Sequence, residues 1–120
     1  MLLVAAGIMT FSSCKKDEPK QLPEKVTVSG QVTDKDGHPW VGVHIQMSYN
    51  TFMYPSMDLG EAIYTDENGH YEIEFKPETG HSYRVNFKIV KDGYEYSHHY
   101  YADPWIAEQE YNVVLKKSGE

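Results

Sequence analysis

Apolar and polar residues alternate along most of the chain after residue 25. Between residues 41 and 49, every second position is apolar: Val41, Val43, Ile45, Met47 and Tyr49. A period of two indicates β-strands with one buried face and one solvated face. It predicts strands at 26–34, 40–50, 61–65, 70–76, 81–91, 94–102 and 110–117. No stretch has the period of an amphipathic helix.

Turn-forming pairs separate these segments. Asp36-Gly37, Asn68-Gly69 and Asp92-Gly93 supply the positive φ angles that tight turns need. Short strands with frequent turns predict an all-β fold, a seven-stranded antiparallel β-sandwich over one core. A chain of 120 residues is long enough for one such domain. We place it at residues 26–117, followed by a short tail at 118–120.

The first eleven residues, MLLVAAGIMTF, carry no charge. The run is too short to cross a bilayer, which takes about 20 residues. It also lacks the polar positions that a core helix shows at helical spacing. Its length fits the apolar region of a signal peptide. We therefore interpret residues 1–13 as a signal peptide.

Small residues lead from this run into Cys14, the only cysteine. The stretch resembles the lipobox of bacterial lipoproteins, which implies cleavage before Cys14 and lipidation of its sulfur. The alternative is a buried free cysteine. The next residues, Lys15, Lys16, Asp17 and Glu18, resemble the signal that exports some lipoproteins to the outer face of the Gram-negative outer membrane. The alternative is a solvated tether on a lipoprotein that faces the periplasm.

Residues 14–25 contain two prolines and little that is apolar, which predicts a flexible tether. Together these features predict a lipid-anchored protein of the outer membrane, exposed on the cell surface. A single cysteine cannot form an internal disulfide. The net charge of -7 leaves no basic face for phosphates, so we expect no nucleic-acid partner.

Two segments, 33–38 and 65–70, share the pattern Thr-Asp-x-x-Gly-His. Their spacing resembles the carboxypeptidase-regulatory-like domain. The residues that carry the resemblance are Gly30, Val32, Asp34, Gly37, Pro39, Gly42, Val43, Ile45, Thr65, Asp66, Gly69, Tyr71 and Ile73. The resemblance covers about residues 26–117 and implies a transthyretin-like sandwich. That family is typically non-catalytic and occurs beside peptidases, on outer-membrane transporters and in surface lipoproteins, which implies a binding or accessory module.

Six of these positions are expected to shape the backbone: Asp34, Gly37, Pro39, Gly42, Asp66 and Gly69. Gly37 and Gly69 close turns, because glycine adopts positive φ without strain. Pro39 pre-sets the chain that enters a strand, and Gly42 allows close packing or a bulge.

Six histidines raise the question of a metal site. The zinc spacings His-x-x-Glu and His-Glu-x-x-His are absent from the sequence. The neighbours His98 and His99 point to opposite faces of a strand. Asp34-x-Asp36-Gly37 is a fragment of a calcium loop that turn formation explains. With no Gly-x-Ser-x-Gly motif either, we expect no metal, no cofactor and no catalytic residue.

The segment 51–59 interrupts the alternation with the apolar residues Phe52, Met53, Tyr54, Met57 and Leu59. Connections between strands normally lie on the surface. These residues therefore either form a contact patch or fold back to cap one end of the sandwich.

A second aromatic group consists of Tyr100, Tyr101 and Trp105. It is open to the same two interpretations, contact or packing, because such rings are enriched at interfaces and in cores. As contact residues, both groups would suit a glycan, a peptide or an outer-membrane protein.

The sequence thus predicts a lipid-anchored, non-catalytic binding or accessory module. The alternative is an assembly subunit of a larger surface complex, such as a transporter or a fimbria-like fibre, and an enzyme ranks third.

Overall fold

The computed structural model describes residues 21–117. Nine strands form within this part of the chain, and none of its residues is helical. The strands are β1 (Val26–Thr33), β2 (His44–Thr51), β3 (Met57–Tyr64), β4 (His70–Phe75), β5 (His81–Lys91), β6 (Tyr94–Ala102), β7 (Glu108–Glu110), β8 (Val113–Val114) and β9 (Lys116–Lys117). Consistently, the described residues contain no helix long and apolar enough to cross a membrane.

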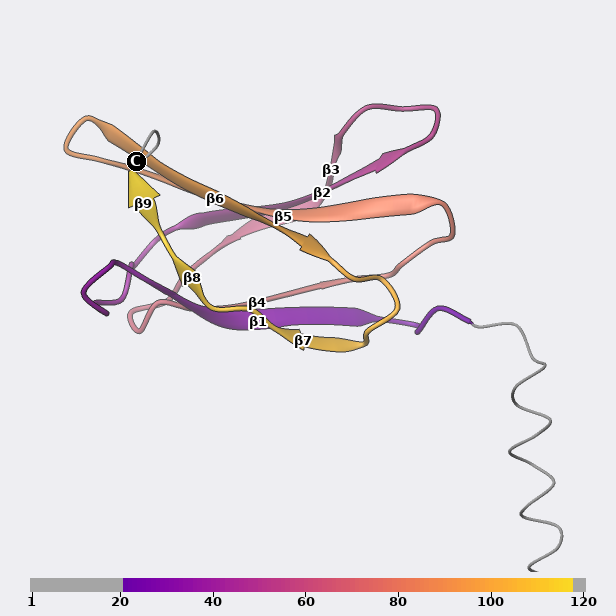
Figure 1. Ribbon diagram of the computed structural model, residues 1–120, viewed down its shortest axis with the longest axis horizontal. Helices are drawn as coiled ribbons and strands as arrows, with labels where there is room; N and C mark the ends of the chain where they lie inside the picture. The colour runs from indigo at the N-terminus through magenta and orange to yellow at the C-terminus, as the bar shows by residue number, and fades with distance from the viewer. Residues whose placement is uncertain (1–20, 118–120) are drawn as a thin grey trace, which may run out of the picture.

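The strands form two sheets that pack against each other (Figure 1). One sheet has the order β4-β1-β7, with β8 also paired to β1, and the other has the order β3-β2-β5-β6-β9. The apolar side of the alternation fills the space between them. The buried apolar residues are Val26, Val28, Val32, Val43, Ile45, Met47, Tyr71, Ile73, Phe75, Tyr83, Val85, Phe87, Ala102, Val113 and Leu115. The predicted all-β sandwich is confirmed.

The strand predicted at 61–65 is longer than expected, because β3 begins at Met57. Leu59 pairs with Met47, but the register of β2 and β3 shifts between Ile45 and Met47. Gly60, with φ 73°, lies at this irregularity. Because a bulge breaks the alternation of buried and exposed residues, the sequence pattern does not predict a strand at residues 57–60.

The strand predicted at 40–50 begins later, at His44. Gly42 adopts φ 77°, which takes residues 40–43 out of the extended conformation. Their backbone bonds run to two neighbouring segments instead. Trp40 N donates to Val32 O and Gly42 N donates to Thr65 O. A Cβ at Gly42 would meet nothing within 4 Å, so backbone conformation and not close packing explains this glycine.

The strand predicted at 110–117 is divided into three short ones, and here the prediction of purely antiparallel pairing is wrong. β7 and β8 pair in parallel with β1, whereas β9 crosses to β6 in the other sheet. Tyr111, Val113 and Leu115 still turn toward the core, as the alternation predicted. Alternation reports which face a side chain occupies, but not which strand is its neighbour.

The two ends of the sandwich differ in what they carry (Figure 1). We call the end where residue 21 lies the N-terminal end. The β2–β3, β4–β5 and β6–β7 connections are at this end. The opposite end, which we call the far end, carries the β1–β2, β3–β4 and β5–β6 connections.

Candidate functional site

The β2–β3 connection carries the most exposed apolar side chains of the N-terminal end. Phe52 is 98% exposed, Met53 72% and Tyr54 60%, and Met57 is also exposed. We call these four residues the apolar tip. These four side chains do not fold back over the sandwich, whereas Leu59 packs partly against the core. A contact role for the four exposed residues stays a prediction.

Backbone bonds and one side chain set the shape of the tip. Thr51 Oγ1 accepts hydrogen bonds from Met53 N (3.1 Å) and Tyr54 N (3.0 Å). Thr51 N donates to Tyr54 O (3.2 Å). A threonine hydroxyl that caps backbone N–H groups in this way stabilises a turn. The turn therefore forms without packing of Phe52 or Met53, and their side chains project outward.

A row of rings connects the tip to the core. Tyr49 stacks on His81 at 5.1 Å between ring centroids, and His81 lies parallel to Tyr83 at 6.0 Å. Tyr83 in turn packs on Phe75 at 4.3 Å. Burial raises the pKa of the Tyr83 hydroxyl. Since β2 and β5 pair directly here, the tip extends from a hydrogen-bonded part of the sheet. Sequence reasoning did not identify this row, because Tyr49 and His81 belong to separate strands.

Trp105 and Ile106 lie in the β6–β7 connection, at the same end as the tip (Figure 1). Their exposed fractions are 41% and 48%. The buried Gln109 organises this connection. Its Oε1 accepts from Asp103 N (3.1 Å), and its Nε2 donates to Asp103 O (2.5 Å) and Ile106 O (2.9 Å). The sequence pattern singles out neither Ile106 nor Gln109. Gln109 occupies an inward position of the alternation, but it is polar, and the pattern marks inward positions by apolar residues.

Tyr100 and Tyr101, neighbours in sequence, point to opposite sides of their sheet. Tyr100 faces inward, where its ring stacks on Tyr111 at 4.0 Å and its hydroxyl donates to Gln109 Oε1 (2.8 Å). Burial, with a smaller contribution from Asp103, raises the pKa of Tyr100. The structure therefore assigns Tyr100 to packing and does not bring it together with Tyr101 and Trp105.

Tyr101 is exposed on the outer face of the five-stranded sheet. Its register partner is Arg84, which pairs onward with Ser48, so the three side chains lie in one row across the sheet. Tyr101 also contacts His99 edge to face at 5.4 Å. The Nε of Arg84 is buried and has no hydrogen-bond partner within residues 21–117. This outer face offers an aromatic ring beside a guanidinium.

Two groups with a shifted pKa lie where β4 and β6 face the segment after β7. Burial raises the pKa of Tyr71 and lowers that of His98. Tyr71 Oη donates to Tyr111 O (2.6 Å), and His98 Nε2 lies 2.6 Å from Tyr111 Oη. These contacts hold the segment after β7 against the core. The shifts of these two groups follow from their burial in packing contacts.

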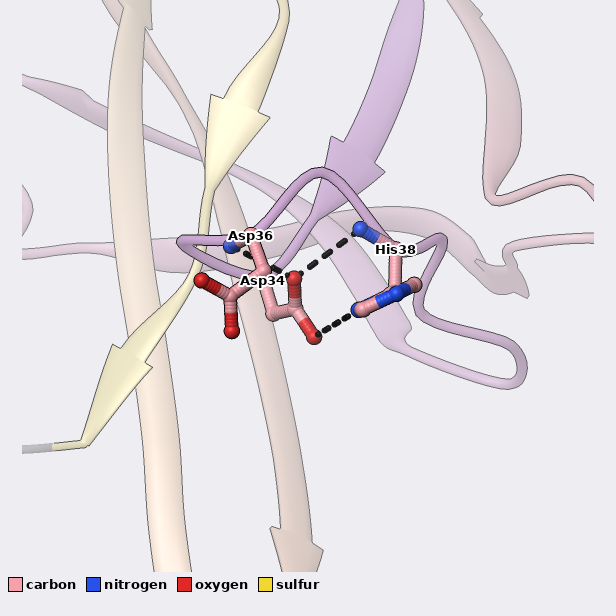
Figure 2. A group of neighbouring side chains, drawn as sticks. All are labelled: Asp34, Asp36 and His38. Carbon is pink, nitrogen blue, oxygen red and sulfur yellow. Dashed lines mark hydrogen bonds and ion pairs between the residues drawn. The ribbon is translucent and has the colours of Figure 1, made fainter.

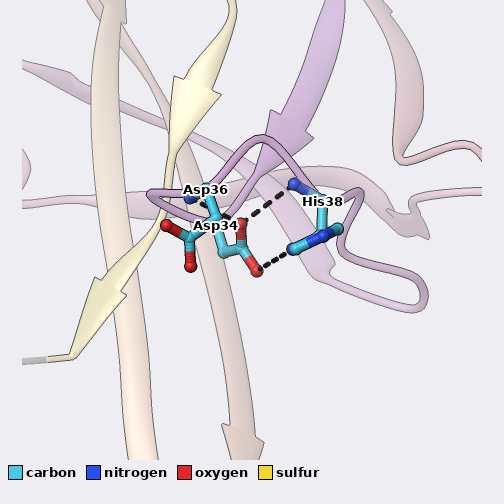
Figure 3. A network of polar contacts seen from close by, with 3 residues as sticks. All are labelled: Asp34, Asp36 and His38. Carbon is cyan, nitrogen blue, oxygen red and sulfur yellow. Dashed lines mark hydrogen bonds and ion pairs between the residues drawn. The ribbon is translucent and has the colours of Figure 1, made fainter.

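One group of side chains in the described region has the composition of a metal site. The potential ligand atoms of Asp34, Asp36 and His38 lie within 4.8 Å of one another. Figure 2 shows the Asp34 carboxylate directed toward His38, with the Asp36 carboxylate on the other side. Asp34 Oδ1 accepts from Asp36 N (2.8 Å) and His38 N (2.9 Å), and Oδ2 lies 3.3 Å from His38 Nδ1. Backbone donors and the ring thus already use the Asp34 carboxylate (Figure 3).

The segment 65–70 forms the same turn without the second carboxylate. Asp66 Oδ1 accepts from Asn68 N (2.9 Å) and His70 N (2.9 Å), as Asp34 does from its own turn. The geometry at 33–38 is therefore explained by turn formation. It gives no separate support for a cation.

Cys14 and the residues Lys15, Lys16, Asp17 and Glu18 lie outside the described residues. Lipidation and export remain predictions from the sequence.

No family model matches the chain, and a search of curated proteins finds no match. Solved structures do match its fold. A streptococcal ancillary pilin aligns with a TM-score of 0.54 and 18% identity, over 78% of this chain and 33% of that one. The 3-chlorocatechol 1,2-dioxygenase of Rhodococcus opacus 1CP aligns with a TM-score of 0.53 and 17% identity, over 83% and 62%.

The C-terminal domain of a shaft pilin from Lactobacillus rhamnosus GG aligns with a TM-score of 0.51 and 12% identity. This match covers 80% of the present chain and the whole of the pilin domain. The chain spans less than two thirds of the ancillary pilin and of the dioxygenase. At such identities the likeness shows a shared β-sandwich fold and nothing about activity.

Proposed function

We propose that the chain is a lipid-anchored, non-catalytic binding or accessory module, held at the outer membrane of a Gram-negative bacterium and facing the cell exterior. The observation that supports a contact role is the apolar tip, whose exposed side chains project from a hydrogen-bonded turn. Exposed apolar groups gathered in one connection mark contact sites more often than chance. The anchor is supported by the sequence from residue 1 to Glu18.

A carboxypeptidase-regulatory-like, transthyretin-like domain is the family we propose. Its support is the pair of Thr-Asp-x-x-Gly-His segments, which form two turns with the same hydrogen bonds at the far end of a two-sheet sandwich. A non-catalytic role is supported by the contacts of the groups with shifted pKa. Tyr71 and His98 take part in interior packing, and Asp34 and Asp66 accept backbone hydrogen bonds within turns.

The outer face around Tyr101 is the surface that best suits a glycan or a peptide. Tyrosine rings stack on apolar faces of ligands while their hydroxyl stays hydrated. The neighbouring Arg84 offers donors that match a carboxylate. We expect Tyr101→Ala to abolish binding on a glycan or peptide array, with Tyr94→Ala, an exposed tyrosine elsewhere on β6, as the control. Equal binding by both variants would remove this face from the proposal.

Metabolic labelling with a clickable fatty acid tests the anchor. The wild-type chain should take the label and Cys14→Ala should not, because the thiol is the proposed acceptor. Equal labelling of the two chains would contradict the lipoprotein assignment. Protease treatment of intact cells then tests the exposed location, since a domain that survives on whole cells but not on lysed cells faces the periplasm.

A second candidate is an assembly subunit. β3 is an edge strand of eight residues, and an unpaired edge offers hydrogen bonds to a strand of another chain. The fold likeness to two pilin domains is compatible with this role. Cross-linking followed by pull-down separates the candidates: a stable stoichiometric protein partner favours assembly, and ligand binding without such a partner favours the first proposal.

A further inference from the structure

The apolar tip and the start of the described chain lie at the same end of the sandwich (Figure 1). Gln21 follows Cys14 by seven residues. Even fully extended, a chain of that length spans at most about 25 Å. A lipid on Cys14 would therefore hold the N-terminal end close to the bilayer and bring the tip within reach of the same membrane.

The tip has the chemistry of a membrane-interface contact. Phe52 is apolar and almost fully accessible, and Met53 is apolar and largely exposed. Tyr54 adds a ring with a polar hydroxyl, the type enriched at membrane–water boundaries. The backbone N–H groups of Met53 and Tyr54 already donate to Thr51 Oγ1. Insertion therefore leaves neither N–H group without a partner, which would otherwise be costly in lipid.

We propose that the apolar tip docks on the surface of the lipid bilayer that carries the anchor, with Phe52, Met53 and Tyr54 inserted at the headgroup boundary. This inference rests on the proposed lipid anchor. Trp105 and Ile106 at the same end provide a second, smaller contact. A contact linked to the anchor forms at high effective concentration, so even a small apolar surface at the tip can stay docked.

The charges around the tip indicate an apolar and not an electrostatic contact. Segments 50–60 and 101–110 contain no lysine, arginine or histidine, and both contain acidic residues, including Asp58 and Asp103. Neither segment therefore offers a positive charge to an anionic surface. Docking should therefore be as strong on neutral phosphatidylcholine vesicles as on vesicles that contain phosphatidylglycerol, and it should not weaken as salt is raised.

A single thiol probe tests the proposal on the full mature lipoprotein, reconstituted in phosphatidylcholine vesicles. The cysteine of Phe52→Cys carries an environment-sensitive fluorophore. The quencher is either a nitroxide-labelled lipid in the vesicle membrane or iodide in the external solution. Val90→Cys is the matched control. Val90 is apolar and 62% exposed, like the tip, but it lies near the β5–β6 turn at the far end. Because both side chains are exposed, neither substitution should disturb folding.

We expect the probe at position 52 to shift to shorter wavelength, to lose most of its emission to the lipid quencher and to be shielded from iodide. The probe at position 90 should behave in the opposite way. Equal quenching at the two positions would overturn the inference. So would shielding of position 52 on cells but not in vesicles, which would place the tip on a membrane protein. Stronger quenching with phosphatidylglycerol would contradict the apolar mechanism.

The wild-type chain separates failure of the anchor from failure of the tip. Its only cysteine is Cys14, so after denaturation it takes no thiol reagent if that sulfur carries a lipid thioether. Labelling of the wild type would overturn the anchor and with it the proposed function. With the thiol of Cys14 shown to be blocked, the probe at position 52 on the lipidated chain decides the tip alone: quenching by vesicle lipid retains the contact, and its absence removes the contact while the anchor and the proposed function stand.

Discussion

Two turns at the far end have nearly the same sequence and the same hydrogen bonds, but different surroundings. In residues 33–38 and 65–70 the aspartate accepts from the backbone N–H groups two and four residues later. In each, the glycine N also donates to the aspartate carbonyl. Gly37 has φ 89° and Gly69 has φ 77°. The backbone conformation therefore follows from the motif itself.

The neighbours of the two turns differ. A Cβ on Gly37 would meet nothing within 4 Å, whereas on Gly69 it would lie 2.6 Å from the carbonyl oxygen of Val32 and 3.0 Å from Cβ of Pro39. Val32 N also donates to Gly69 O (2.8 Å). The second turn is part of the core boundary and the first is a surface loop. A shared motif thus predicts a shared conformation, but not a shared contribution to stability.

The largest difference is expected for alanine at the two glycines. Gly37→Ala should destabilise the fold by about 1–2 kcal/mol, the usual penalty of an L-residue in the left-handed region. Gly69→Ala adds an overlap with Val32 and should cost roughly 1–3 kcal/mol more. Urea unfolding of the two purified variants measures the difference. Equal midpoints would show that the Val32 segment shifts freely and that the two turns are equivalent.

The next largest difference in stability is expected for valine at the threonines that begin the two turns. The buried Thr65 Oγ1 accepts from Val43 N (2.9 Å) and donates to Trp40 O (2.6 Å). Thr65→Val keeps the shape but leaves both backbone groups without a partner, which costs about 1–3 kcal/mol. Thr33 is less buried, and its hydroxyl makes no such pair of bonds, so Thr33→Val should change stability by less than about 0.5 kcal/mol. A similar loss of thermal stability in both variants would contradict this account.

The aspartates should make the two turns alike in acid. Backbone hydrogen bonds, from His38 to Asp34 and from His70 to Asp66, lower the pKa of both carboxyls below 3.8 in the folded state. The unfolded chain then binds protons more readily, so this stabilisation is complete above the unfolded pKa and is lost as pH falls through the folded pKa. Asp34→Asn and Asp66→Asn should each reduce the fall in melting temperature between pH 5 and pH 3 by a similar amount, with Asp58→Asn as control.

The smallest effect is expected for cations. Asp36→Asn gives the first turn the Asp-x-Asn-Gly-His composition of the second. Because backbone donors and His38 already use the Asp34 carboxylate, Ca²⁺ or Zn²⁺ should leave the melting temperature of wild type and Asp36→Asn unchanged. A rise that occurs only in the wild type would show that the first turn binds the cation and would end the equivalence of the two turns.

Alternation of residue types predicted the strands well, and the exceptions have clear physical causes. In β5 the buried Tyr83, Val85 and Phe87 alternate with polar residues, so the pattern alone places them in the core. The bulge at Gly60 hid the start of β3, and the left-handed Gly42 moved the start of β2. The parallel pairing of β7 and β8 with β1 left no trace in the sequence, since alternation is the same in either direction.

The candidate surface was only partly predictable. Sequence identified the tip residues but could not distinguish projection from capping, because an apolar loop satisfies either arrangement. The separation of Tyr100 from Tyr101 was available from the sequence, since neighbours on a strand face opposite sides. The roles of Gln109 and of the Tyr49–His81 stack required contacts between residues far apart in the chain.

By itself, the sequence determined the fold class, the inward faces of the strands and the conformation of both Thr-Asp-x-x-Gly-His turns. Each depends on residues close together in the chain, through strand alternation or short-range hydrogen bonds. The tertiary structure decided which turn borders the core, which aromatic rings remain exposed, and that the apolar tip lies at the end where the chain begins. These depend on how distant strands pair, because pairing brings together segments that local patterns do not connect.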